Sequence, residues 1–128
     1  MAAVVYLDTH VVAWLFAGST DLVSGKARQL IRTHDLVISP MVRLELQYLY
    51  EIGRAKAGAE AVIGDLRRSI GLSYCARPFT QIIETAERFS WTRAPFDRII
   101  VAQAAIGRNL LITKDESLLK HYKNAVWE

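Results

Sequence analysis

Short apolar segments alternate with longer amphipathic segments along this chain of 128 residues, and this alternation restricts the fold most. The short segments carry few polar side chains, a pattern typical of strands that are buried on both faces. We expect strands at residues 3–7, 36–38, 72–76, 110–113 and 125–127. Because helical segments separate these strands, the sequence predicts a three-layer α/β fold, with a short central parallel sheet flanked by helices.

Capping residues, glycine and proline indicate where the helices begin and end. We expect helices at residues 9–16, 25–33, 39–52, 59–70, 80–89, 95–106 and 116–122. Thr9 and Ser24 are expected to cap the first two helices, and Gly18 to end the first. Ser39-Pro40 is a strong helix start, because serine caps a helix and proline fits its first turn.

The composition is that of a globular protein, with 52% hydrophobic and 23% charged residues. The single cysteine, Cys75, excludes an internal disulfide and a zinc site made of thiolates. The apolar run that begins at Ala2 has no basic residue before it, which indicates a strand and not a signal peptide. We therefore expect a single domain over residues 1–128, located in the cytoplasm and without a membrane partner. The net charge of +3 permits a polyanionic partner.

Four carboxylates lie directly beside segments that should be part of the core. Asp8 and Asp115 follow expected strands, Asp97 opens an apolar helical segment, and Glu45 interrupts the apolar stripe of helix 39–52. A buried or half-buried carboxylate costs free energy unless its charge is compensated. Four of them in such positions suggest a bound divalent cation.

Glu45 is the acid that local structure explains least. The apolar stripe around it consists of Val42, Leu46, Leu49 and Ile52, and a second apolar face consists of Met41, Leu44 and Tyr48. With two apolar faces, this helix is expected to be largely enclosed. Glu45 would then be no freely solvated acid, although a buried ion pair with an arginine from another segment is an alternative.

The other three acids have alternative explanations at helix starts. Asp8 and Asp115 could each cap the helix that follows. Asp97 could complement the positive end of the helix dipole in the first turn of its helix.

Oxygen ligands without thiolates suit Mg²⁺ or Mn²⁺ and not zinc. Asp8 and Asp115 lie at or just past the carboxyl ends of expected strands, where parallel sheets bind ligands. Phosphodiester hydrolysis often uses such a site, because the metal activates a water and neutralises charge on the phosphate oxygens. Apolar packing around the acids also predicts that one carboxyl takes up a proton when the metal is absent.

Four motifs follow one another along the chain. They are Tyr6-Leu7-Asp8-Thr9-His10, Ile38-Ser39-Pro40 followed by Leu44-Glu45-Leu46, Pro95-Phe96-Asp97-Arg98-Ile99-Ile100-Val101-Ala102-Gln103-Ala104, and Leu111-Ile112-Thr113-Lys114-Asp115. In these motifs and their order, the chain resembles PIN-domain ribonucleases of the VapC toxin type. The motifs span nearly the whole chain, and the phenylalanine-aspartate-arginine helix start is the most specific of them.

The resemblance implies a single PIN domain with an acidic pocket. Asp8, Glu45, Asp97 and Asp115 would be the catalytic and metal-binding residues, with Asp8 and Asp97 holding the principal Mg²⁺ or Mn²⁺. The hydroxyl of Thr113 would lie near this pocket. The resemblance further implies a metal-dependent endoribonuclease with an RNA substrate, which forms a homodimer and is the toxin of a VapBC-type pair. A cognate VapB-like antitoxin would neutralise it.

Two other classes of function remain as alternatives. A phosphoaspartyl enzyme could use Asp8 as a nucleophile, but Thr9-His10 provide no second aspartate two residues further on. A non-catalytic interaction module could use the acidic pocket to pair with arginines of a partner. Binding of Mn²⁺ distinguishes this module from a metal-dependent enzyme, because the module should not respond to the metal.

Overall fold

The computed structural model describes residues 3–128, so Ala2, at the start of the first apolar run, lies outside the described residues. The strands are β1 (Val4–Leu7), β2 (Asp35–Ile38), β3 (Ser73–Tyr74), β4 (Leu110–Ile112) and β5 (Ala125–Val126). They form one sheet in the order β3-β2-β1-β4-β5. Every pairing is parallel, which confirms the predicted sheet. The two edge strands are shorter than expected, since each has a partner on one side only.

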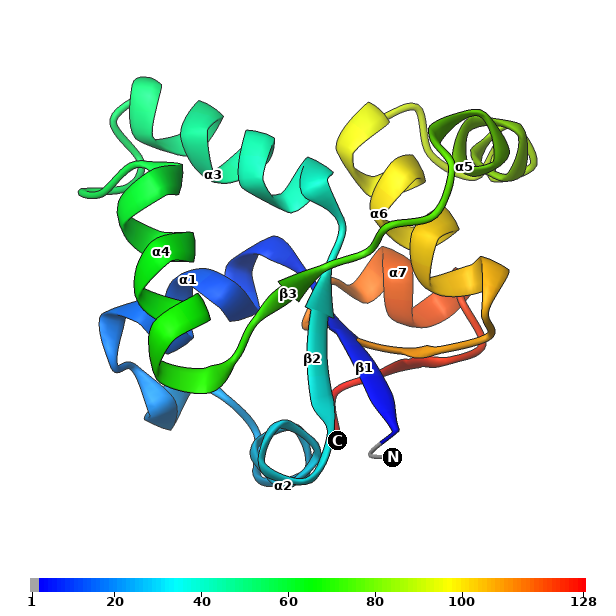
Figure 1. Cartoon of the computed structure of the whole chain (residues 1–128). Coiled ribbons are helices and arrows are strands. Elements are labelled where there is room, and N and C mark those ends of the chain that lie inside the picture. Colours follow the sequence, from blue (N-terminus) through cyan, green and yellow to red (C-terminus); the bar gives the residue numbers. More distant parts are fainter. Residues whose placement is uncertain (1–2) are drawn as a thin grey trace.

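The helices flank this sheet. They are α1 (Thr9–Ala17), α2 (Gly25–Thr33), α3 (Pro40–Glu51), α4 (Ala59–Ile70), α5 (Phe79–Ala86), α6 (Pro95–Ile106) and α7 (Glu116–His121). Figure 1 shows α1, α3 and α4 on one side of the strands and α5, α6 and α7 on the other, which confirms the three-layer arrangement. A short 3₁₀ helix, Thr20–Leu22, was not predicted. Within residues 3–128, no helix is both long enough and apolar enough to span a bilayer.

The first helix begins differently from the prediction. Asp8, and not Thr9, is its N-cap, because the Asp8 carboxylate accepts a hydrogen bond from the backbone N–H of Thr9. Thr9 is already helical, and its side chain is fully buried. Gly18 ends the helix at a φ of 72°, a left-handed conformation that glycine adopts without steric cost. The predicted caps Ser24 and Ser39 are confirmed.

Helix α3 is less enclosed than its two apolar faces suggest. Val42 and Leu46 are buried, but Leu44 is 56% exposed and Tyr48 is 48% exposed. The helix contacts α1, α4 and α6. These neighbours cover the face that carries Val42 and Leu46. Leu44 and Tyr48 stay about half exposed, although the Tyr48 ring packs against Phe96 of α6. The expectation of a largely enclosed helix was therefore wrong.

Candidate active site at the carboxyl edge of the sheet

The central strands deliver three polar residues to one edge of the sheet. Ser39 follows β2, Asp8 follows β1 and Thr113 follows β4. Leu7 pairs with Ile112, and the Asp8 N–H donates to the Ile112 carbonyl at 3.0 Å, so Asp8 and Thr113 are neighbours. The chain proceeds from β1 to β2 on one side, while β4 flanks β1 on the other. This reversal of strand order is where open parallel sheets form a ligand-binding crevice.

Buried polar side chains are concentrated at this edge. Among the described residues, the buried polar or charged ones are Asp8, Thr9, Ser39, Gln103 and Thr113. Within residues 3–128, no buried side-chain nitrogen or oxygen atom lacks a hydrogen-bond partner. A satisfied network of this kind holds its members in defined orientations.

Asp8 lies at the centre of the network and is 7% exposed. Its Oδ1 accepts from the Thr9 N–H at 2.8 Å, and its Oδ2 accepts from the Thr113 hydroxyl at 2.7 Å. Burial raises the pKa of Asp8, and these two hydrogen bonds oppose that rise. The carboxylate is thus oriented by the start of α1 and the end of β4 together.

Glu45 reaches the same region from α3. The Thr9 hydroxyl donates to Oε1 of Glu45, and the side chain is half-buried. Burial raises the pKa of Glu45, and the charges of Asp8 and Asp115 add to the rise. Arg43 on the same helix instead contacts Glu60 at 2.6 Å, the one ion pair among the residues that the structure describes. An internal arginine therefore does not explain Glu45.

Asp97 shows that the four acids lie within electrostatic reach of one another. It is half-buried in the first turn of α6. Burial, followed by the charges of Asp8, Asp115 and Glu45, raises its pKa to about 6. A helix dipole alone would lower the pKa of an acid in the first turn. The surroundings of Asp97 outweigh the dipole, so the dipole does not account for this residue.

Asp115 departs from the expectation of an acid beside the core, because its side chain is exposed. Its Oδ1 caps α7 by accepting from the N–H groups of Ser117 at 2.8 Å and Leu118 at 3.1 Å. Its own N–H donates to the Thr113 hydroxyl at 3.0 Å. The chain leaves the sheet after Ile112 to begin α7, which carries Asp115 outward. The capping role is confirmed, and Thr113 links this acid to Asp8.

The chemistry of these donors fits a divalent cation, although their arrangement is open. Carboxylate oxygens are the ligands that Mg²⁺ and Mn²⁺ prefer. Within residues 3–128, however, no three His, Cys, Asp or Glu side chains are arranged so that they could hold one ion. Magnesium is commonly held by one or two carboxylates, with waters and phosphates as its other ligands. The residues present therefore fit a cation that is largely hydrated.

Residues 5–124 match the family model of the PIN domain. The chain belongs to the PIN domain family. Two solved structures with similar folds are VapBC2 from Rickettsia felis, bound to a DNA fragment from the promoter, and VapBC-1 from nontypeable Haemophilus influenzae. The first is 17% identical, with a TM-score of 0.68 and 98% of this chain and 97% of the other covered. The second is 18% identical, with a TM-score of 0.65 and coverage of 98% and 96%. No curated protein is significantly similar in sequence.

Sequence reasoning missed the roles of Gln103 and Thr9 in this PIN domain. The Ser39 hydroxyl donates to Oε1 of the buried Gln103, which ties the start of α3 to the middle of α6. Thr9, which was expected only to cap a helix, instead orients Glu45. Gln103 carried a signal, because it is a polar residue between Ala102 and Ala104 within an apolar helix.

The raised pKa of Asp97 predicts how the stability of this PIN domain depends on pH. The folded-state pKa of about 6 exceeds the ordinary value of 3.8, so between these values the folded state binds more protons than the unfolded state. The metal-free protein should therefore lose stability as pH rises through this window. After allowance for solvent screening of a half-exposed group, Asp97→Asn should add about 1 kcal/mol at neutral pH, or about 4 °C in Tm.

Thermal unfolding in EDTA across this pH range measures that effect. The wild-type and Asp97→Asn melting temperatures should converge near pH 4 and separate as pH rises toward neutral. A constant difference between the two proteins at every pH would contradict a raised Asp97 pKa.

Proposed function

We propose that this chain is a cytoplasmic, metal-dependent endoribonuclease, the VapC-type toxin of a toxin–antitoxin pair. Nucleases with this domain are hydrolases that act on nucleic acids and generally use divalent metal ions. The similar structures from Rickettsia felis and Haemophilus influenzae are VapBC complexes. Among nucleic acids, we propose RNA as the substrate of this chain.

The observation that carries this proposal is the placement of four carboxylates at one edge of the sheet, where burial and neighbouring charges raise the pKa values of Asp8, Glu45 and Asp97. Asp8 and Asp97 would hold the principal Mg²⁺ or Mn²⁺, and Glu45 and Asp115 would be further ligands, directly or through water. A bound cation would relieve the repulsion that raises the pKa of Asp97. It would supply an activated water and neutralise charge on the phosphate oxygens.

The chain's own residues would prepare this site. Thr113 holds Asp8 in one orientation and also meets the N–H of Asp115. Thr9 holds Glu45. Because the hydroxyls hold the acids in place before substrate arrives, less ordering is needed when the phosphate binds.

Incubation of the purified chain with total RNA tests the proposal. With Mn²⁺ or Mg²⁺ present, we expect cleavage at discrete sites, and EDTA should abolish it. RNA that stays intact with either metal, including structured and single-stranded species, would count against the ribonuclease.

A VapB-like antitoxin and a second copy of the chain are the protein partners that we propose. For the second copy, α3 and its C-cap residue present Leu44, Tyr48 and Ile52 at intervals of four residues, and all three are exposed. Apolar side chains aligned on an open helix face commonly mark a protein interface.

Leu44→Glu is expected to weaken a homodimer at least about tenfold, since it places a charge where an apolar side chain would be buried. Light scattering after size-exclusion chromatography measures the mass. Leu22→Glu is the matched control, because Leu22 is 44% exposed on a different part of the surface. Equal masses for wild type and Leu44→Glu across a dilution series would exclude this face.

The non-catalytic module remains the second candidate function. One observation favours it: within residues 3–128, none of the four acids forms an ion pair with a basic residue. In that case the acids would pair with arginines of a partner. Mn²⁺ would then leave the melting temperature unchanged, whereas a metal-binding nuclease should be stabilised by the ion.

A further inference from the structure

A cavity of about 490 Å³ lies between α1, α3 and α4, beside the acidic site. Its walls include His10, Trp14, Leu46, Leu49, Arg54 and Lys56. Leu46 is buried, and Trp14 is half-buried against the core. The volume is within the range of small-ligand pockets, and an apolar floor with an aromatic wall is typical of them.

This cavity and the acids share part of one wall. His10 lines the cavity from the first turn of α1, two residues beyond Asp8, and the Thr9 hydroxyl between them donates to Glu45. Leu46, on the cavity floor, directly follows Glu45 on α3. The cavity therefore adjoins the acids along α1 and α3.

The charged residues that line the cavity are basic. Arg54 and Lys56 are exposed at its edge, and no carboxylate is among the lining residues. Lys114 also lies near the aromatic wall, with Nζ at 5.9 Å from the centre of the Trp14 ring. The surroundings suit a ligand that carries negative charge and has a flat apolar part.

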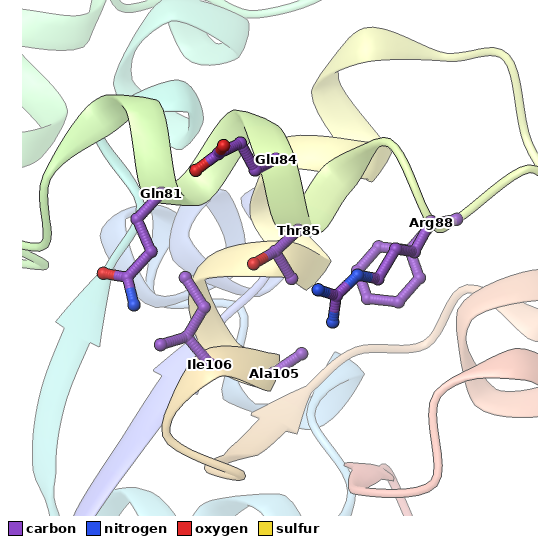
Figure 2. A pocket seen from close by; sticks show the side chains of 7 residues that line it. Gln81, Glu84, Thr85, Arg88, Ala105 and Ile106 are labelled. Atoms are coloured by element: carbon purple, nitrogen blue, oxygen red, sulfur yellow. The ribbon is translucent and has the colours of Figure 1, made fainter.

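A second cavity on the same chain lacks this combination. It lies between α5 and α6, and Figure 2 shows Gln81, Glu84 and Arg88 around it. Its residue Ile106 is nine positions beyond Asp97 on α6, or about 13 Å along the helix axis. It includes an acid and is remote from the carboxylate cluster, so it provides a matched control surface.

We propose that the cavity beside His10 and Trp14 binds one nucleobase of the RNA strand, next to the phosphate at the acids. This inference rests on the proposed ribonuclease function. Single-stranded RNA is commonly read by bases that are splayed out and stacked on aromatic side chains. Arginine and lysine only donate hydrogen bonds, so Arg54 and Lys56 favour a base edge that carries carbonyl oxygens. Guanine carries O6 and uracil carries O4 at the position where adenine and cytosine carry an amino group, which also only donates, so guanine and uracil are preferred over adenine and cytosine.

Nuclear magnetic resonance with mononucleotides tests the site without any cleavage. The three tryptophans give three indole N–H signals, and Trp14→Phe identifies that of Trp14. GMP and UMP should shift the Trp14 signal in a saturable way, while the Trp91 signal serves as the internal control. AMP and CMP should bind at least about tenfold more weakly, the effect of one lost charged hydrogen bond. Ribose 5-phosphate, which lacks a base, should leave the signal unchanged.

Exposed variants test the edge of the cavity without disturbing the core. Arg54→Ala and Lys56→Ala together should weaken GMP binding about tenfold or more, and Arg88→Ala should not change it. An unmoved Trp14 signal with every nucleotide would overturn the proposal and leave the cavity to an apolar segment of a partner protein. An equal response to ribose 5-phosphate, or to all four bases, would overturn the base subsite or its selectivity.

The outcomes separate this inference from the proposed function. In a pool of random single-stranded RNA, the wild type should cut with a preference for guanine or uracil at one position, and the Arg54 and Lys56 variants should lose that preference. Cleavage without nucleotide binding at Trp14 would refute the subsite and keep the ribonuclease. Nucleotide binding without cleavage would support the subsite and refute the ribonuclease.

Discussion

Asp8→Asn is expected to lower metal-dependent RNA cleavage at least about 100-fold. Both oxygens of Asp8 are already oriented, one by the Thr9 N–H and the other by the Thr113 hydroxyl. Asparagine keeps the shape of the side chain: its carbonyl oxygen can accept from the Thr9 N–H, and its amide group can donate to the Thr113 hydroxyl oxygen in place of the bond that this hydroxyl now donates. It loses the negative charge that would hold a cation, so the loss of activity should come without a comparable loss of stability.

Asp35→Asn is the control for Asp8→Asn. Asp35 is an exposed aspartate at the opposite, amino end of the sheet, where it pairs with Val4. The measurements are cleavage rates with Mn²⁺ and melting temperatures in EDTA. Cleavage by Asp8→Asn at the wild-type rate would remove Asp8 from the site, or reveal a contaminating nuclease.

Thr113→Val is expected to reduce both stability and activity. The Thr113 side chain is fully buried, and its hydroxyl donates to Asp8 and accepts from the Asp115 N–H. Valine has nearly the same shape but leaves a buried carboxylate oxygen without its partner, which costs about 1–3 kcal/mol. The lost hydrogen bond also leaves the burial-induced rise in the Asp8 pKa less opposed. Cleavage should fall about 10- to 100-fold, as for other residues that orient metal ligands.

Thr113→Ser distinguishes the hydroxyl from the packing of the side chain. Serine keeps the donor and removes one methyl group, so most of the activity should return, with a stability cost of about 1 kcal/mol. Urea unfolding in EDTA and cleavage with Mn²⁺ are the two measurements. If valine and serine were equally active, the Thr113 hydroxyl would have no part in orienting Asp8.

Much of the fold follows from local patterns in the sequence. The predicted helices 25–33, 59–70 and 95–106 coincide with α2, α4 and α6, since each is bounded by a capping residue, a glycine or a proline. The last helix before β3 ends at Gly71 in a left-handed conformation, as its sequence indicates. The ends of β3 and α5 were less well predicted, because edge pairing and helix fraying depend on neighbouring elements.

Sequence periodicity gave a wrong prediction for the exposure of side chains on α3. The stripe of Leu44 and Tyr48 is as apolar as that of Val42 and Leu46, so α3 was expected to be enclosed on both faces. Periodicity identifies which residues share a face, but whether another element covers that face depends on the tertiary arrangement. Asp115 shows the same limit, because its distance from the core depends on the direction the chain takes after β4.

The sequence by itself determined the α/β class and the parallel sheet, and it predicted the four site acids Asp8, Glu45, Asp97 and Asp115. Apolar periodicity and capping involve residues that are close in sequence, so both can be identified from the sequence alone. Only the tertiary structure decided which hydroxyl orients which acid. It also placed Asp97 close enough to the other three acids for their charges to raise its pKa. Those contacts join residues up to 105 positions apart, as Thr113 and Asp8 are. Strand order brings them together, and strand order emerges only when the whole sheet assembles.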